Sequence, residues 1–316
     1  MPQNQRPLLG FLLAINTVVF WGALPIAQKV LIQVMDPYTI TWYRFLSASI
    51  FLLIVLGVRK RLPSKSNFTK NVILLLIVAT VGLNANYILY LIGLRFIEPA
   101  HTQVIIQTAP LFFSLGSMYF FKERFNVKQW IGFGILNLGF ILFFNKKLFE
   151  FFYNFDDYFF GTLIIVLAAL TWAFYAIAQK RLLKDLSSQN IMMIIYIGCT
   201  LSLSPFIEPS SISALNDVEI WILIFCALNT LLAYGSFAEA LAHWEATKVS
   251  AVLAITPIMT FIFVALTNNY FPEMIHKESF DFLVVLGALM VVLGSMAISL
   301  SKNKNAVPVK IAPSKT

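Results

Sequence analysis

The chain has 316 residues, of which 59% are hydrophobic and only 12% are charged. An ordinary soluble domain has roughly 25% charged residues, and a chain of this length cannot bury so much apolar surface. The composition therefore excludes a soluble globular protein, and the net charge of +8 has to be explained within a membrane protein.

Ten apolar runs follow one another along the chain, and most approach the ~20 residues that a helix needs to cross a bilayer. Hydrocarbon offers no hydrogen-bond partner, so backbone groups must pair within each segment, and the runs are too long for barrel strands. The sequence thus predicts an all-α polytopic membrane protein with ten transmembrane helices. The runs cover residues 8–28, 45–58, 71–94, 104–121, 129–144, 159–178, 190–207, 220–241, 249–271 and 280–300.

The basic residues are distributed unevenly between the two sets of loops. With a cytoplasmic N-terminus, the cytoplasmic loops and tails carry 17 Lys and Arg residues and the outer loops carry four. Because basic residues are concentrated on the cytoplasmic side, both termini are expected there, in a plasma membrane or, for a prokaryote, the inner membrane. The positive charge thus indicates topology, and no nucleic acid is expected as a partner.

The chain lacks the short motifs of common catalytic sites. It contains no G-x-x-x-x-G-K-[ST], no H-E-x-x-H, no G-x-S-x-G and no C-x-x-C. Its two cysteines, Cys199 and Cys226, fall within apolar runs and are interpreted as small buried hydrophobes. We therefore expect no enzyme, no cofactor and no metal site.

The connections between the runs are short. The longest lie near 59–70, 145–157 and 208–217 and have about a dozen residues each, which is too few for a catalytic domain. Residues 302–316 are rich in Lys, Asn and Pro, and this composition predicts a disordered cytoplasmic tail.

The chain contains an internal repeat. The segment WGALPIAQK, Trp21–Lys29, returns 151 positions later as WAFYAIAQK, Trp172–Lys180, with five of nine letters unchanged. The shifts between matches change only across loops, as expected when helices are kept and connections vary in length. Further matches at shifts of 147 and 155 pair Glu98 with Glu245, Pro110 with Pro257, Gly132 with Gly287 and Gly139 with Gly294.

Each half of the chain, roughly 1–146 and 157–301, holds five apolar runs. Because five is odd, the first runs of the two halves enter the membrane from opposite sides, and the halves are inverted relative to one another. Inverted repeats are typical of secondary transporters, in which a central site is exposed to alternate sides. The alternative is a duplication that only enlarges a helix bundle.

Several local motifs carry a resemblance to a known family. They are the pair Trp21–Gly22, YRFLSASIFLL around Arg44, TAPLFFSLGSMYFFKER around Pro110, its counterpart ITPIMTFIFVALTNNYFPE around Pro257, and the glycine-spaced IGFGILNLGFILF and LGALMVVLGSMAI. With these motifs in order over nearly its whole length, the chain resembles the EamA-type family of the drug/metabolite transporter superfamily.

The resemblance implies a central cavity lined by the first, third and fourth spans with the sixth, eighth and ninth, and it implies export from the cytoplasm. The second half departs from the first in two places. It has Ile195 where the repeat places Arg44, and Ala173 where the repeat places Gly22. A symmetric role for Arg44 is therefore not expected.

Polar and aromatic side chains within the runs are the candidate substrate contacts. They usually face the bundle interior because they cost free energy in lipid, and Trp21 and Gln28 share one helical face. The alternative is that the aromatic residues are interfacial anchors and the amides hold helices together. The candidates for substrate binding are Trp21, Gln28, Asn84, Tyr87, Tyr90, Gln103, Gln107, Trp172, Tyr175, Gln179, Tyr234 and Ser250.

Four further residues are candidates for movement or coupling. Pro110 and Pro257 each remove a backbone hydrogen bond within a run, so each predicts a hinge or a fixed kink. Arg44 lies about six residues into the second span, whose mildly polar extension precedes the apolar run 45–58. There it either snorkels to the outer headgroups or holds a substrate carboxylate or a helix C-terminus. Glu239, an acid within an apolar run, is a candidate proton carrier.

The sequence therefore predicts a secondary transporter in the lipid bilayer, exporting small amphipathic metabolites such as amino acids by alternating access. Neutral or zwitterionic solutes are favoured over cations because no acid lies near mid-membrane. A homodimer is compatible with this prediction. The alternatives are an intramembrane enzyme, which would need an acid–base or metal cluster at membrane depth, and a binding or assembly protein that does not transport.

Overall fold

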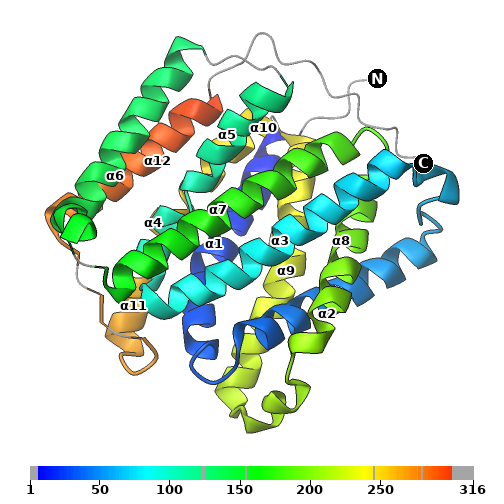
Figure 1. Cartoon of the computed structure of the whole chain (residues 1–316), viewed down its shortest axis with the longest axis horizontal. Helices are drawn as coiled ribbons and strands as arrows, with labels where there is room; N and C mark the ends of the chain where they lie inside the picture. The colour runs from blue at the N-terminus through cyan, green and yellow to red at the C-terminus, as the bar shows by residue number, and fades with distance from the viewer. Residues whose placement is uncertain are drawn as a thin grey trace.

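The computed structural model is helical throughout the part of the chain that it describes, with twelve α-helices and three short 3-10 helices (Figure 1). The expected cytoplasmic tail, 302–316, lies outside the described residues. Those that the structure describes are 6–121, 126–153, 155–244, 246–275, 277–278 and 280–300.

The helices of the first half begin at residues suited to start a helix. Asp36 accepts hydrogen bonds from the backbone of Tyr38 and Thr39, and Pro37 follows it in the first turn, where its missing N–H costs nothing. The helices are α1 (Pro7–Leu31), α2 (Pro37–Val58), α3 (Lys70–Phe96), α4 (Pro99–Ile105), α5 (Thr108–Phe121) and α6 (Val127–Tyr153), with η1 (Lys65–Asn67) between α2 and α3.

The second half repeats this order. Asp156 and Ser187 cap the first two helices through their side chains, and Asn216 forms a reciprocal capping box with Glu219 at the third. The helices are α7 (Asp157–Leu182), α8 (Ser188–Leu203), α9 (Asp217–His243), α10 (Ala246–Leu253), α11 (Thr256–Tyr270) and α12 (Phe282–Leu300), with η2 (Ser204–Phe206) and η3 (Pro209–Ala214) before α9.

Within the described residues, eight helical stretches are long and apolar enough to cross a membrane, and Phe282–Ile298 is a shorter apolar helix. The fourth expected run, 104–121, is divided between α4 and α5. The connection expected near 145–157 is mostly helix, because α6 continues to Tyr153. Run lengths read from hydropathy therefore miss helical turns that carry charged residues.

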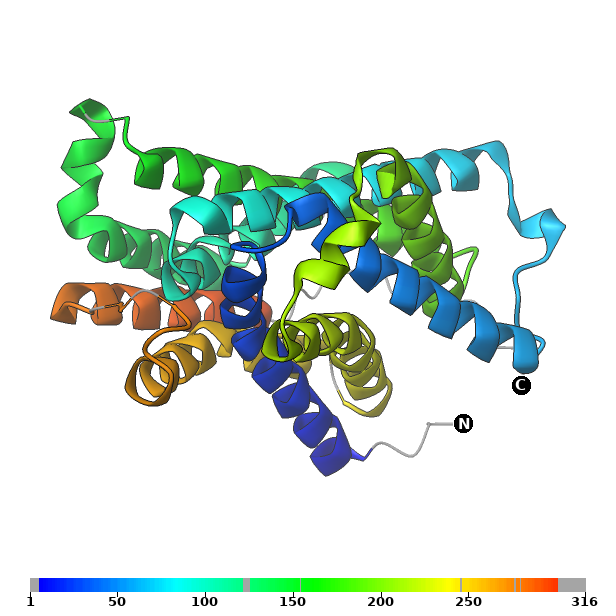
Figure 2. The same ribbon diagram turned by 90° about the horizontal axis from the view of Figure 1, so that it is seen from below.

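Several helix pairs are related by the repeat: exchanging each helix for its counterpart in the other half gives another observed pair. The α3–α7 pair of one side corresponds to α9–α1 on the other, and α5–α7 corresponds to α11–α1. The pairs α2–α8 and α6–α12 join equivalent helices of the two halves. Figure 1 shows α3 and α7 side by side across the molecule, and both Figure 1 and Figure 2 show α6 and α12 paired at one edge.

Glycines allow α6 and α12 to approach backbone to backbone. A Cβ on Gly139 would lie 2.6 Å from the backbone nitrogen of Val291 and 2.9 Å from the carbonyl oxygen of Gly287, and a Cβ on Gly132 would lie 2.9 Å from the Gly294 oxygen. Small residues drive this kind of contact in membranes, where apolar side chains gain nothing by leaving lipid. The sequence repeat pairs Gly132 with Gly287, but the contact pairs it with Gly294, as two antiparallel copies require.

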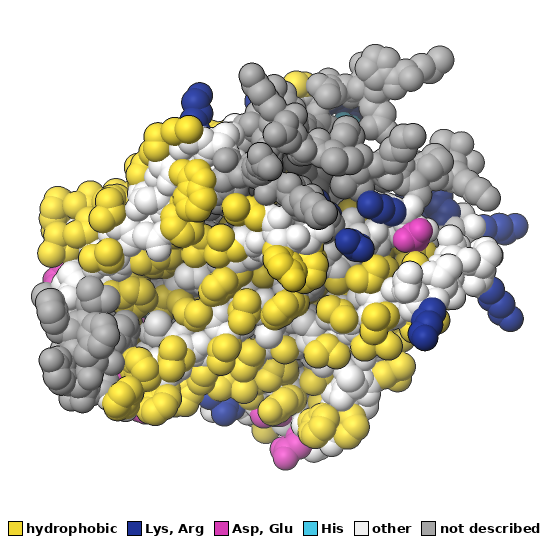
Figure 3. Space-filling model, turned by 45° about the horizontal axis from the view of Figure 1, so that its top comes forward, with side chains coloured by type: hydrophobic (Ala, Val, Ile, Leu, Met, Phe, Trp, Pro, Cys, Tyr) yellow, Lys and Arg dark blue, Asp and Glu magenta, His cyan; other side chains and the backbone are white. Residues whose placement is uncertain are grey.

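The outer surface is apolar over most of its area. Figure 3 shows hydrophobic side chains covering much of the face in view, with Lys and Arg gathered at its right-hand edge. Large exposed apolar side chains lie on most of the helices, which indicates contact with lipid rather than water. The connection between α2 and α3 carries the exposed basic residues Arg59, Lys60, Arg61, Lys65 and Lys70.

Candidate functional site

Two of the expected membrane-spanning runs are broken into two helices each. The fourth span is interrupted between α4 and α5, and the ninth between α10 and α11. Pro110 is the third residue of α5 and Pro257 is the second of α11, so each proline starts a new helix rather than kinking a continuous one. Discontinuous helices at corresponding positions of two halves are the pattern that marks binding sites in secondary transporters.

The two breaks touch each other. The Gln107 side-chain nitrogen donates to the Ala254 carbonyl oxygen at 3.4 Å, and the repeat shift of 147 makes these two residues equivalent. Each break also binds one of its own carbonyls through a threonine: Thr108 Oγ1 donates to Ile105 at 2.9 Å, and Thr256 Oγ1 donates to Leu253 at 2.6 Å. Each break therefore forms part of its own backbone hydrogen bonds, and the two breaks contact each other through residues that are equivalent in the repeat.

An aromatic and polar cluster joins α1, α2 and α3 of the first half to α9 of the second. Trp21 of α1 meets Tyr234 of α9 edge to face, with ring centroids 5.4 Å apart. Tyr87 of α3 stands over the Arg44 guanidinium, whose Cζ lies 4.6 Å from the ring centroid. Arg44 Nε donates to Thr230 Oγ1 of α9 at 3.1 Å. Three expected site residues and the expected charge are thus brought together.

Arg44 does not snorkel to the headgroups. Its exposed fraction is 3%, and its contacts lead inward to α3 and α9. Neither contact is with a helix C-terminus, and the proposed role of Arg44 in holding a substrate carboxylate stays a prediction.

Other expected site residues form two smaller groups. Tyr90 donates its hydroxyl to the Gln103 side-chain oxygen at 3.1 Å, which joins α3 to α4. Trp172 of α7 meets Phe113 of α5 edge to face at 6.2 Å, and it meets Tyr175 at 6.3 Å. These contacts lie on the two helices next to the first break.

Several expected site residues bind neighbouring helices instead. Asn84 donates to Ser202 of α8 at 2.9 Å. Tyr175 and Gln179 both approach the Met192 sulfur of α8, at 3.2 and 3.5 Å. For these three residues the structure records helix-to-helix contacts of the kind described by the packing alternative.

Three candidates remain to be placed. Gln28 is buried, and its side-chain oxygen has no partner among the described residues. The side chain of Glu239 is 63% exposed and lies 3.1 Å from His243 one turn later. Ser250 belongs to α10, but its side chain lies outside the described residues.

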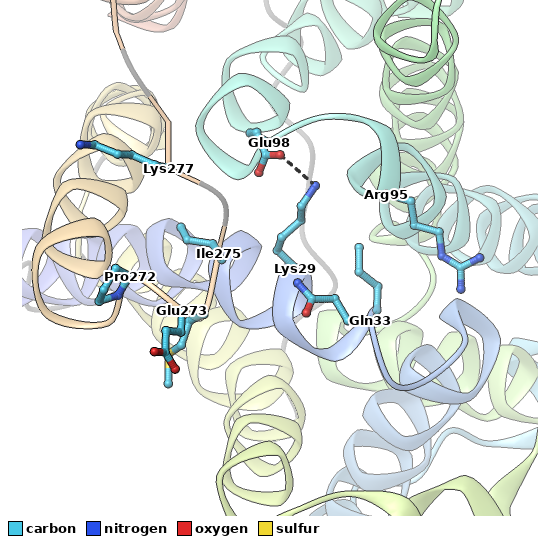
Figure 4. Close-up of a pocket in the computed structure, with 10 residues that line it drawn as sticks. Lys29, Gln33, Arg95, Glu98, Pro272, Glu273, Ile275 and Lys277 are labelled. Atoms are coloured by element: carbon cyan, nitrogen blue, oxygen red, sulfur yellow. Dashed lines mark ion pairs between the residues drawn. The ribbon is translucent and has the colours of Figure 1, made fainter.

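A second polar cluster lies at the end of α1. Lys29 is 6% exposed, and its ammonium donates to the carbonyl oxygens of Leu94 and Ile97 at 2.9 and 3.0 Å and lies 3.5 Å from Glu98. It thereby closes the C-terminal end of α3, where a helix carries partial negative charge. Figure 4 shows Lys29 and Glu98 turned toward one another in a cavity of about 490 Å³, with Arg95 at one edge and Lys277 at the other.

A buried acid lies beside this cavity. Glu278 accepts from the backbone nitrogen of Ala100 at 3.4 Å, and its other oxygen lies 3.4 Å from the His101 ring nitrogen. Its side chain is fully buried. The loop before α12 is therefore tied to the start of α4.

Sequence reasoning did not predict the clusters at this end. The repeat matches Lys29 with Lys180 and Glu98 with Glu245. A Lys and a Glu that both recur in the second half are a signal for an ion pair, but the repeat alone does not indicate that Lys29 contacts Glu98. Glu278 lies in a short connection and offered no pattern that would have identified it.

Comparison with known proteins supports the resemblance found in the sequence, and the matches cover both halves of the chain. The sequence pattern of the EamA-like transporter family matches residues 8–145 and again 159–300. The uncharacterized inner membrane transporter YhbE of Escherichia coli (strain K12) is 42% identical over 93% of this chain and 92% of its own length. An uncharacterized transporter of Haemophilus influenzae is 35% identical, over 93% of this chain and 95% of its own length.

A solved crystal structure of a protein with 14% sequence identity is similar in fold. The TM-score is 0.63, and the match covers 92% of this chain and 97% of that chain. At this identity the similarity concerns the fold alone.

Proposed function

Because the chain belongs to the EamA-like transporter family, we propose that it is a secondary transporter that exports small amphipathic metabolites, amino acids foremost, by alternating access. Its transport site lies between the two halves, where Trp21, Tyr87, Tyr234 and Arg44 meet. Aromatic faces and hydrogen-bonding groups in a buried setting suit a solute with an apolar body and a polar end.

We further propose ten membrane crossings, with α4–α5 and α10–α11 each serving as one crossing. The halves, 1–146 and 157–301, are then inverted, and both termini lie in the cytoplasm. The exposed basic residues of the α2–α3 connection support this orientation. The names of the relatives support a multi-pass inner membrane location.

The observation that carries the proposal is the contact between the two helix breaks. Gln107 donates to Ala254, and the repeat makes these two residues equivalent. A pseudo-symmetry axis through a pair of broken helices gives each half the means to adopt the other's arrangement. Pro110 and Pro257 keep both breaks from closing into a continuous helix, since neither residue can donate a backbone hydrogen bond.

Transport is tested directly with purified protein in proteoliposomes. The panel contains amino acids, nucleosides, sugars and cationic dyes, each with and without a pH gradient. We expect saturable movement of amino acids above that of empty liposomes. Movement of no solute would contradict the proposal, as would gradient-driven transport of cationic dyes that is lost in Glu239→Gln.

The topology is tested by labelling single cysteines in intact cells. The native thiols of Cys199 and Cys226 are buried, so an impermeant reagent reports on introduced positions. Ser213, on η3, and Lys65, on η1, are both exposed. We expect Ser213→Cys to be labelled from outside and Lys65→Cys to be labelled only after the cells are opened. Equal labelling of both in intact cells would exclude the inverted ten-span arrangement.

A further inference from the structure

Arg44 is a buried cation with too few partners. It is 3% exposed, and its contacts are the single bond from Nε to Thr230 and the ring of Tyr87. Among the described residues, neither terminal nitrogen has a hydrogen-bond partner and no carboxylate lies within ion-pair distance. A guanidinium has five N–H donors, and an uncompensated charge in the interior of a membrane protein is costly.

Tyr196 of α8 presents a second incomplete group in the same cluster. Its side chain is 2% exposed, and its hydroxyl has no hydrogen-bond partner in the described part of the chain. The Phe45 ring, next to Arg44 in the chain, packs against both tyrosines, with its centroid 4.6 Å from that of Tyr87 and 5.5 Å from that of Tyr196.

Buried polar groups in native proteins almost always find partners. Here donors from two helices, α2 and α8, lack acceptors within one aromatic cluster. A further hydroxyl without a partner, that of Thr41, lies one turn before Arg44 on α2. An acceptor completes such a set, and beside a guanidinium an anion is favoured because it also balances the positive charge.

We propose that Arg44 and the Tyr196 hydroxyl bind the carboxylate of the transported metabolite, which makes a carboxylate an obligatory feature of the cargo. This inference rests on the proposed transport function and adds to it the chemical class of the solute. A carboxylate accepts two parallel hydrogen bonds from a guanidinium and a further one from a hydroxyl. The rings of Tyr87, Tyr234 and Trp21 are then available to its apolar body.

The repeat supports an asymmetric binding site. Ile195 stands where the second half would carry the counterpart of Arg44, and Phe45 is the counterpart of Tyr196. Each half thus supplies one polar group at these positions and one apolar group. In the proposed site both polar groups bind the same anion, which orients the solute in one direction.

Binding to the purified full-length protein tests this inference without requiring transport. The probes are matched pairs that differ only at the carboxylate: phenylalanine and phenylalaninamide, tryptophan and tryptophanamide, phenylacetate and phenylacetamide. We expect the acids to raise the unfolding temperature in detergent and the amides to leave it unchanged. Stabilisation by acid and amide alike, or by none of the probes, would overturn the proposal.

Variants identify the residues. Tyr196→Phe keeps the ring and should weaken binding of the acids roughly tenfold, while Tyr38→Phe, on an exposed residue of α2, should leave it unchanged. Arg44→Gln should abolish the preference for the acid over the amide, and Arg44→Lys should retain part of it. Unaltered acid binding in Tyr196→Phe would remove that residue from the site, and a preference retained in Arg44→Gln would refute the role of the guanidinium.

The two proposals fail in different ways. If the acids bind selectively but no solute crosses proteoliposomes, the protein has the carboxylate site and the transport function is wrong. If proteoliposomes move neutral sugars or nucleosides as well as acids, the transport function stands and the carboxylate requirement is wrong.

Discussion

The two halves of the molecule meet in two very different places. Along α6 and α12 the contact is made of glycines that bring backbones together, with Gly139 beside Gly287 and Gly132 beside Gly294. In the centre the contact is made of rings and polar groups, and Arg44 and Tyr196 lack hydrogen-bond partners among the described residues. The α6–α12 contact is formed by closely packed backbones, whereas the central contact contains donors that we propose bind the transported solute.

The difference between these two contacts indicates which one can change during transport. Backbone packing at α6–α12 tolerates no change in spacing, because a shift of a fraction of an ångström brings main chains into collision. In the centre, Arg44 and Tyr196 have few hydrogen bonds to lose, so a rearrangement there costs less free energy. A transporter needs both a fixed contact between its halves and a variable one, and here the two are separated in space.

The largest effect is expected at the glycine contact. Gly139→Leu should cost about 3 kcal/mol of unfolding free energy, at the upper end of overpacking effects, because a Cβ there meets the α12 backbone. Gly134→Leu, on the same helix, is the control, since a Cβ at Gly134 meets nothing within 4 Å. Denaturant unfolding in mixed micelles measures both. Equal stability of the two variants would show that α6–α12 is not the rigid contact.

A smaller effect is expected at Lys29, which lies outside both interfaces. Lys29→Met removes two charge-assisted hydrogen bonds to Leu94 and Ile97 and should cost about 2 kcal/mol. Its repeat partner Lys180 is half-buried, and because solvent screens a partly exposed charge, Lys180→Met should cost about 1 kcal/mol or less. Thermal unfolding compares the two, and a larger loss at Lys180 would contradict this assignment.

Tyr196→Phe should change stability in the opposite direction. Removing a buried hydroxyl that has no partner should raise the unfolding free energy by about 1 kcal/mol, while transport falls. A variant that gains stability and loses function indicates that the removed group binds a ligand rather than stabilising the fold. If Tyr196→Phe is instead less stable than the wild type, the hydroxyl has a structural partner and the contrast between the two interfaces disappears.

The smallest change in stability is expected at the contact between the breaks. Gln107→Ala loses one long hydrogen bond to Ala254, so the unfolding free energy should change by about 1 kcal/mol or less. Transport should fall nonetheless, because this contact joins the two elements that are proposed to rearrange. Proteoliposome uptake compared with unfolding separates the two effects. Normal uptake would assign Gln107 to helix packing.

Much of this architecture follows from local sequence patterns. The resemblance to the EamA-type family is confirmed by the family match over both halves, and the apolar runs predicted helices that the structure contains. Hydropathy succeeds here because lipid imposes the same requirement on every residue of a span. The ten crossings and the cytoplasmic termini stay predictions.

The breaks were indicated only in part. Pro110 and Pro257 predicted a hinge or a kink, and the structure places each just inside the start of a separate helix. A proline fixes where a helix cannot continue, but whether the chain bends or stops depends on what satisfies the freed carbonyls. In this protein Thr256 binds the Leu253 carbonyl freed by Pro257, whereas the Ile106 carbonyl freed by Pro110 accepts from the Ala109 backbone.

The sequence by itself determined that this is a membrane protein with an internal repeat, and it predicts that the two halves are inverted, because charge, hydropathy and repeat spacing are properties of the chain alone. Only the tertiary structure decided which polar residues meet. Tyr175 and Gln179 turn to Met192, Arg44 turns to Tyr87 and Thr230, and Lys29 closes a helix end. The physical reason is that the partner of a buried polar group is set by helices distant in sequence, whose packing no local pattern records.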